Sequence, residues 1–302
     1  MSCLILKFGG AAMGSIERFS KLATFIESRL KYHAQEDFVN LGLARQSQID
    51  KNEKHHSRVG KGDEEGQFDK VAASQNSPKL TEGGIEDVKI VVVVSAMGTT
   101  TDELLNLAKT VHPNPPKREQ DMLISVGERV SMALLAMALE LRGIDAISFT
   151  GSQSGIITTS DHSEAQILKV RPERIEKALA EKKVVIVAGF QGVSLEKEIT
   201  TLGRGGSDTS AVALAVALGC KKVEFYKDVP GIGEKNPKVH PDVEIFSKLT
   251  YEEALGIVGE GAEVLHHRCL ELAKKHGILL EIRPFYAPEK VGTIIYYEVA
   301  HV

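Results

Sequence analysis

The segment Arg204-Gly-Gly-Ser-Asp208 carries a fixed cation and a carboxylate around two glycines. Apolar residues recur after it at helical spacing, which predicts a helix with Ser207 or Asp208 as its N-cap and Gly219 at its end. The first N–H groups of a helix have no partner within it, and glycines let a ligand approach them. The segment therefore indicates an anion-binding site. The alternative is a capped helix beside a surface arginine.

Lys7-Phe8-Gly9-Gly10 offers a second set of groups suited to a phosphate. An apolar run ends at this segment and a helix is expected from near Ser15, so these residues would lie at the carboxyl end of a strand. Gly9 and Gly10 can turn backbone N–H groups toward a phosphate, while Lys7 supplies a point charge for a migrating phosphoryl group. A simple turn after the strand is the alternative.

Two further segments could contact the acceptor of such a group. Ser95-Ala-Met-Gly98, followed by Thr101, places hydroxyl residues and glycine after a second strand. Gly127-Glu128 reads as the middle of a long apolar helix, where glycine costs about 1 kcal/mol relative to alanine. A closely bound ligand would explain that cost, with Glu128 receiving an ammonium group. The alternatives are an ordinary helix entry after Ser95 and a solvated glutamate.

The elements that position these residues read as alternating strands and helices. This pattern predicts an α/β fold, a three-layer αβα sandwich with a mostly parallel central sheet. Several runs are apolar at nearly every position, as expected of strands buried on both faces. Two amphipathic stripes predict helices that cover the sheet. The predicted strands are Cys3–Phe8, Lys89–Val94, Ala146–Phe149, Val184–Ala188, Lys222–Tyr226, Leu279–Ile282 and Thr293–Tyr297. The stripes are Ile16, Phe19, Ala23, Ile26 and Leu30, and Leu123, Val126, Val130, Leu134, Met137 and Leu141.

Composition narrows the class of protein. The 302 residues, 42% of them hydrophobic, can bury a large core without disulfides. A net charge of −4 argues against nucleic acid as a partner. The three cysteines lie far apart and the ten histidines lack metal-ligand spacing, so we expect no protein metal site and a reducing, cytoplasmic location. No apolar run approaches the roughly 18 residues of a membrane span, and residues 33–87 read as a polar, disordered insertion.

Taken in this order, the segments resemble the aspartate kinase branch of the amino-acid kinase family. The resemblance covers nearly the whole chain apart from the insertion. It implies one amino-acid kinase domain over residues 1–302, with an amino-acid-substrate lobe at 1–199 and a nucleotide-binding lobe at 200–302. The matching segments are Lys7–Gly10, Val94–Gly98 with Thr101-Asp102, Gly127-Glu128, Ala188–Gly192, Ile199–Asp208, Lys227–Gly231, Asn236–Lys238, Gly261-Ala262 with Val264–His266, and Gly292-Thr293.

The resemblance implies that MgATP phosphorylates the side-chain carboxylate of L-aspartate, giving 4-phospho-L-aspartate for lysine, threonine, methionine and diaminopimelate synthesis. An ionised carboxylate needs no general base, so the site must align the reactants and offset charge. On the family pattern the catalytic residues are Lys7, Asp208 and Arg204. The substrate would contact Thr101, Glu128, Arg204 and Ser95, with Glu128 on its ammonium and Arg204 on a carboxylate. ATP would contact Lys7, Phe8, Gly9, Gly10, Lys227, Asp228, Gly233, Lys238 and Glu263, and its phosphates would carry Mg²⁺. The resemblance places Lys227 and Asp228 near adenine or ribose and Lys238 near the phosphates.

The chain also departs from the family pattern. Lys227 stands where threonine is usual, Gly233 where an aromatic residue is usual, and Glu263 where a basic residue is usual. Asn236-Pro-Lys238 replaces Asp-Pro-Arg, and Ala11 replaces a hydroxyl residue, as does the next alanine. These changes leave nucleotide affinity and base preference open.

Alternatives to this reading remain open from the sequence. A relative acting on glutamate, acetylglutamate, carbamate or UMP is one, and a nucleotide or amino-acid sensor without turnover is another. Relatives usually carry paired ACT domains after the kinase domain, and this chain stops about where they would begin. Absent feedback, a separate regulatory chain and a truncated sequence all fit that observation, and a homodimer is compatible with it.

Overall fold

The computed structural model describes residues 3–31, 89–259 and 264–297. The predicted insertion at 33–87 and the candidate ATP contact Glu263 lie outside these residues. The chain divides into two units, 29–87 and a larger body made of 1–28 and 88–302.

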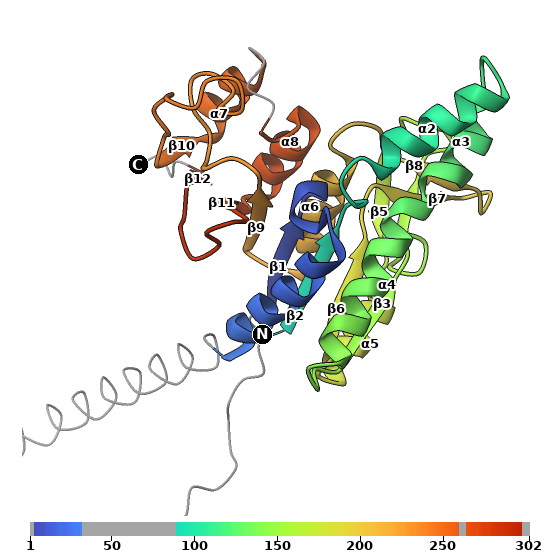
Figure 1. Ribbon diagram of the computed structural model, residues 1–302, viewed down its shortest axis with the longest axis horizontal. Helices are drawn as coiled ribbons and strands as arrows, with labels where there is room; N and C mark the ends of the chain where they lie inside the picture. Colours follow the sequence, from blue (N-terminus) through green and yellow to red (C-terminus); the bar gives the residue numbers. More distant parts are fainter. Residues whose placement is uncertain (1–2, 32–88, 260–263, 298–302) are drawn as a thin grey trace, which may run out of the picture. The chain divides into compact units, whose positions relative to one another are not determined.

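An eight-stranded sheet forms the centre of this body (Figure 1). Its strands are β1 (Cys3–Phe8), β2 (Lys89–Val94), β3 (Ala146–Phe149), β6 (Val184–Ala188), β9 (Lys222–Lys227), β10 (Lys248–Thr250), β11 (Leu279–Pro284) and β12 (Thr293–Tyr296). Their order is β10-β12-β11-β9-β1-β2-β6-β3, and all neighbours are parallel except β11 and β12. All seven predicted strands are present, and β10 is the one strand of this sheet that was not predicted.

Helices cover both faces of the sheet, which confirms the three-layer prediction. On one face, α5 (Glu173–Ala180), α6 (Gly206–Leu218), α7 (Tyr251–Gly259) and α8 (His267–His276) pack against strand residues such as Ile5, Val93 and Phe225. The other face carries the helix that begins at residue 16, which runs to residue 28 within this body, and α4 (Val126–Glu140). Arg142, just after α4, forms an ion pair with Glu27 of the first helix. Alternate strand residues therefore point to different helical layers.

The long apolar helix predicted around Gly127 is two helices. α3 (Lys117–Ile124) ends before Ser125 and α4 begins after it, so Gly127 lies in the first turn of α4. A Cβ on Gly127 would lie 2.7 Å from the Cβ of Ala96. Close packing of α4 on the loop after β2, rather than a ligand, therefore explains the glycine.

Four of the apolar residues predicted to face the sheet from α4 and its end are exposed to solvent instead. Val126 and Val130 are 43% and 44% exposed, and Met137 and Leu141 are exposed by 65% and 90%. The helix instead turns a mixed face inward, because its small residues permit a closer approach to the sheet than large apolar ones would. That buried face consists of Gly127, Glu128, Ser131, Leu135 and Leu139.

A second, four-stranded sheet was not predicted at all. It has the order β5-β4-β7-β8, with β4 (Ile156–Thr158), β5 (Ile167–Val170), β7 (Gln191–Ser194) and β8 (Ile199–Thr201). Its strands have three or four residues each, and their hydroxyl residues are Thr158, Ser194, Thr200 and Thr201. They lack the apolar runs by which the central strands are recognised.

One helical stretch is long and apolar enough to pass as a membrane span, contrary to the expectation from sequence. Within Lys117–Glu140 a window has a mean hydropathy of 1.6, and 44% of that window is buried. The stretch is interrupted at Ser125, and α4 packs on the central sheet. We therefore interpret it as part of the sandwich core.

Candidate active site

Three charged side chains meet at the carboxyl ends of β1 and β9. Lys7 Nζ lies 2.5 Å from Asp208 Oδ1, and Lys227 Nζ lies 2.6 Å from Asp208 Oδ2. Lys7 and Asp208 are each only 4% exposed. Lys7 pairs in register with Phe225, so Lys7 and Lys227 point to the face covered by α6, which carries Asp208. The structure thus brings together Lys7 and Asp208, two predicted site residues that lie far apart in the sequence.

The protonation states of this cluster are set by opposing effects. Burial lowers the pKa of Lys7, and Asp208 opposes that effect. Burial disfavours the ionised form of Asp208, but Lys227 and Lys7 together outweigh it and lower the pKa of the carboxyl. A buried carboxylate with a cation on each oxygen satisfies the requirement that buried charges be paired.

The start of α6 differs from the predicted cap. Gly205, with a φ of 67°, is the N-cap, and no side chain caps the helix. Ser207 and Asp208 lie within the first turn, so the predicted capping role is wrong for both. A Cβ on Gly205 would lie 2.1 Å from the Cβ of His266, which excludes other residues there. Arg204, the residue before this cap, is exposed.

The two glycine-containing loops lie against each other. The Gly98 amide donates to the Gly10 carbonyl at 3.1 Å, and the Ser95 amide donates to the Phe8 carbonyl at 3.2 Å. A Cβ on Gly10 would lie 2.8 Å from the Ala96 carbonyl oxygen. Gly10 therefore has a packing reason to be glycine. Thr101 lies in the first turn of α2 (Thr100–Val111) that follows this loop.

Phe8 and Gly9 both contact Tyr226 within the fold. The Phe8 ring is buried and stacks on Tyr226 with a centroid distance of 4.6 Å. The Gly9 amide donates to the Tyr226 carbonyl at 3.3 Å. A ligand would therefore meet the backbone of Phe8 rather than its ring, and Gly10 is better placed than Gly9 to offer a backbone donor.

Glu128 is buried at the start of α4, which corrects the reading as a solvated residue. Its Oε1 accepts a hydrogen bond from the Ala96 amide at 3.1 Å. Its Oε2 is buried and has no hydrogen-bond partner among the described residues. Burial raises the pKa of Glu128 to about 7, while the Ala96 amide and the charge of Lys7 oppose the rise. An unpartnered buried carboxylate oxygen near Lys7 is suited to receive a cationic group.

The remaining candidate ATP contacts among the described residues lie on the loop after β9. Lys238 Nζ lies 2.7 Å from Asp228 Oδ2, and both side chains are accessible to solvent. Gly233 is buried, and a Cβ there would lie 2.8 Å from Val243 Cγ1. Packing of the loop on itself thus explains the glycine, at a position where the family usually has an aromatic ring.

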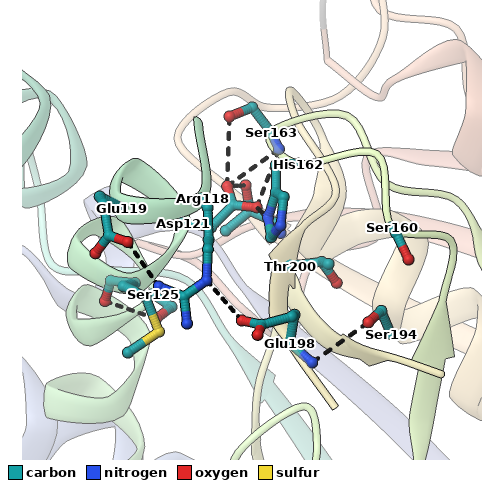
Figure 2. A network of polar contacts seen from close by, with 12 residues as sticks. Arg118, Glu119, Asp121, Ser125, Ser160, His162, Ser163, Ser194, Glu198 and Thr200 are labelled. Carbon is teal, nitrogen blue, oxygen red and sulfur yellow. Dashed lines mark hydrogen bonds and ion pairs between the residues drawn. The ribbon is translucent and has the colours of Figure 1, made fainter. Parts of the chain in front are cut away.

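Asp121 is a buried polar residue that sequence reasoning missed (Figure 2). From α3 it accepts hydrogen bonds from the Ser163 amide at 3.1 Å and from Thr201 Oγ1 at 2.6 Å, and it lies 2.8 Å from His162 Nδ1. These contacts fix the loop at 162–163 and the end of β8, which leads directly to Arg204. One acidic residue in a short amphipathic helix gives no sequence signal for such a role.

Phe190 was also missed, although it lies in the matched segment Ala188–Gly192. Its φ of 67° is unusual for a bulky residue, and such conformations cost about 1–3 kcal/mol. Its amide donates to Ser210 Oγ of α6 at 3.1 Å, and its ring lies where a Cβ on Gly206 would clash. The strained residue therefore packs on the first turn of α6, next to Asp208.

The described residues contain no group of three or more His, Cys, Asp or Glu side chains that could hold a metal ion. His266, which invites a metal role by its position beside His267, accepts a hydrogen bond from the Arg268 amide and serves as the N-cap of α8. That contact is structural.

Comparison with known proteins assigns these features to a family. The sequence model of the Amino acid kinase family matches residues 69–283. An aspartokinase of Mycobacterium tuberculosis is 52% identical over 207 residues, which are 68% of this chain and 49% of that protein. An aspartokinase of Bacillus sp. strain MGA3 is 51% identical over 210 residues, covering 70% of this chain and 51% of that protein. The chain thus spans about half the length of the curated relatives it matches.

Solved structures agree with the observed fold. Aspartate kinase from Synechocystis superposes with a TM-score of 0.69 at 35% identity, covering 100% of this chain and 40% of that one. E. coli aspartokinase III, solved with aspartate and ADP, gives a TM-score of 0.73 at 20% identity over 100% of this chain and 66% of that one. UMP kinase from Ureaplasma parvum gives 0.58 at 15% identity, covering 98% of both chains, and these last two comparisons concern the fold alone.

Proposed function

This chain belongs to the Amino acid kinase family, and on that premise we propose that it transfers the terminal phosphoryl group of ATP to the side-chain carboxylate of L-aspartate. The product is 4-phospho-L-aspartate, the entry to lysine, threonine, methionine and diaminopimelate synthesis. The observation that carries the proposal is the buried cluster of Lys7, Asp208 and Lys227, with the unpartnered oxygen of Glu128 near Lys7. Relatives named aspartokinase, which are 52% and 51% identical in sequence, support aspartate as the acceptor.

In this reaction a carboxylate oxygen of aspartate attacks the γ-phosphorus of ATP. An O–P bond forms while the bond from the γ-phosphorus to the bridging oxygen breaks, and its electron pair stays on the ADP oxygen. No proton moves, because the aspartate side chain is already ionised. The site must therefore align the two anions and offset their charge, which is what Lys7 and the Gly10 amide are placed to do. Asp208 is the positioning residue that holds Lys7.

The acceptor would be held at three points. The Oε2 atom of Glu128 receives the ammonium group, and the guanidinium of Arg204 pairs with the α-carboxylate. Ser95 and Thr101, on the loop that packs against Gly10, help to place the substrate. A binding site for a free ammonium favours aspartate or glutamate over acetylglutamate, carbamate and UMP, which lack that group.

The nucleotide would lie over the carboxyl ends of β1 and β9. Residues 1–199 supply most acceptor contacts and residues 200–302 most nucleotide contacts. Asp228 lies toward adenine or ribose and Lys238 near the phosphates, and Gly233 and Glu263 also belong to the nucleotide site. Because the described residues offer no metal-ligand cluster, Mg²⁺ would be bound mainly by the ATP phosphates. The described cysteines are free thiols, which fits a reducing cytoplasm.

A hydroxylamine-trapping assay tests this proposal. Acyl phosphates react with hydroxylamine to give hydroxamates, so purified protein with MgATP should yield aspartyl hydroxamate, and much less product with glutamate, acetylglutamate or UMP as acceptor. Preference for another acceptor would replace aspartate in the proposal. Nucleotide binding without turnover on any acceptor would favour the sensor alternative.

A further inference from the structure

We propose that Lys227 is a second catalytic cation, which contacts the terminal phosphates of the bound nucleoside triphosphate together with Lys7. The resemblance to the family places position 227 near adenine or ribose, whereas the geometry points to the phosphoryl end. The inference rests on the proposed function only in requiring that the chain bind a nucleoside triphosphate.

The direction of the Lys227 side chain is the first argument. Its Nζ atom contacts Asp208 Oδ2 and lies 5.8 Å from the centre of the Phe225 ring on the same face of β9. Asp228, the next residue, turns away and pairs with Lys238. Of these adjacent residues, Lys227 thus contacts the Lys7 cluster, whereas Asp228 contacts the loop that follows β9.

Charge is the second argument. Asp208 alone would neutralise Lys7, leaving no net charge to offset a triphosphate. With Lys227 on the other carboxylate oxygen, the cluster carries one net positive charge in a largely buried site, where charge interactions are strong. Lys227 is also the more accessible of the two lysines, with 15% of its side chain exposed against 5% for Lys7. It can therefore reach an incoming phosphate while still holding Asp208.

The test is nucleotide binding by the full chain, measured by titration calorimetry with Mg²⁺ and three ligands, AMP-PNP, ADP and AMP. In Lys227→Gln the amide can still donate to Asp208 but carries no charge. We expect this variant to bind AMP-PNP about tenfold or more weakly, since hydrogen bonds to charged groups are the strong ones, and to bind AMP within about twofold of the parent. Lys227→Arg should recover most of the AMP-PNP affinity.

Lys221→Gln is the matched control, because Lys221 is exposed just before β9 and belongs to no part of the site. It should bind all three ligands like the parent. Equal weakening of AMP-PNP, ADP and AMP by Lys227→Gln would place the residue at the nucleoside end and overturn the proposal, as would unchanged binding of all three. A parent protein that binds no nucleotide would instead refute the proposed function, and a failure of aspartate as acceptor would leave the binding result intact.

Discussion

Replacing Glu128 with glutamine should separate the cost of burying this carboxylate from its use in binding. Burial raises the Glu128 pKa to about 7 from an ordinary value of 4.5. Because the folded state holds this proton more tightly, stability falls as pH rises from about 4.5 to 7 and is level above that. The shift corresponds to about 3 kcal/mol of unfolding free energy. A glutamine side chain cannot ionise, so the Glu128→Gln variant should lack this part of the pH dependence.

Urea unfolding between about pH 5 and 9 measures the effect. The difference in unfolding free energy between Glu128→Gln and the parent should change by up to about 3 kcal/mol, in favour of the variant, as pH rises through this window. A buried amide nitrogen without an acceptor costs about 1–3 kcal/mol at every pH, so the slope is diagnostic and the offset is not. Glu176→Gln, on the exposed side of α5, is the control and should follow the parent at every pH.

The same substitution should reduce affinity for aspartate. Loss of an ion pair with the substrate ammonium should raise the aspartate KM about tenfold to a hundredfold and leave the ATP KM within about twofold. In the parent, the aspartate KM should fall as pH rises through about 7, because the ionised form of Glu128 binds the ammonium. If the variant kept the parent's pH slope in both stability and KM, the assignment of Glu128 would be wrong.

Three further substitutions test other parts of the site. Asp208→Asn leaves two ammonium groups without their shared anion and should lower kcat about a hundredfold or more in an ADP-release assay; a near-normal kcat would remove Asp208 from the mechanism. Asp121→Asn turns an amide N–H group toward backbone donors and should cost about 2 kcal/mol in urea unfolding, whereas parent-like stability would show that the hydrogen bonds of Asp121 matter little. Gly10→Ala forces a Cβ toward the Ala96 carbonyl and should cost about 1–3 kcal/mol, while Gly256→Ala, in open space on α7, should be neutral or slightly stabilising; equal effects would contradict the packing argument.

The central sheet was predictable because its strands are short apolar runs. Val91 to Val94 and Val184 to Val187 have the composition of strands buried on both sides. β8, with the sequence Ile-Thr-Thr, could not be found in the same way. Its stability comes from pairing with β7 and from hydrogen bonds to Asp121, and neither partner is visible in a local window of sequence.

The inward face of α4 was mispredicted for a reason tied to the site. Periodicity places large apolar residues inside, but the buried positions of this helix include Gly127, Ser131 and Glu128. The Glu128 carboxylate faces inward and accepts a hydrogen bond from the Ala96 amide, and a glycine is needed where α4 approaches Ala96. Local hydrophobic rules thus fail where chemistry and close packing compete with them.

The residue types of the candidate site were predictable, but the direction of Lys227 was not. Sequence places Lys227 at the end of a strand and says nothing of the strand beside it. Pairing of β9 with β1 in the register Lys7 to Phe225 is a long-range property, and it decides that Lys227 shares Asp208 with Lys7.

In this register the odd-numbered residues of β1 and β9 face one helical layer and the even-numbered residues face the other. Along β1 and β9 the odd-numbered positions carry Lys7 and Lys227, while the even-numbered ones carry Phe8, Lys222, Glu224 and Tyr226 in the opposite layer. Deleting one residue from the middle of β9 would hardly change the hydrophobicity of the strand. It would, however, turn the side chains on one side of the deletion to the opposite face of the sheet. The alternation of side chains along these strands must therefore be kept for the candidate site to form, and insertions or deletions should be confined to the loops.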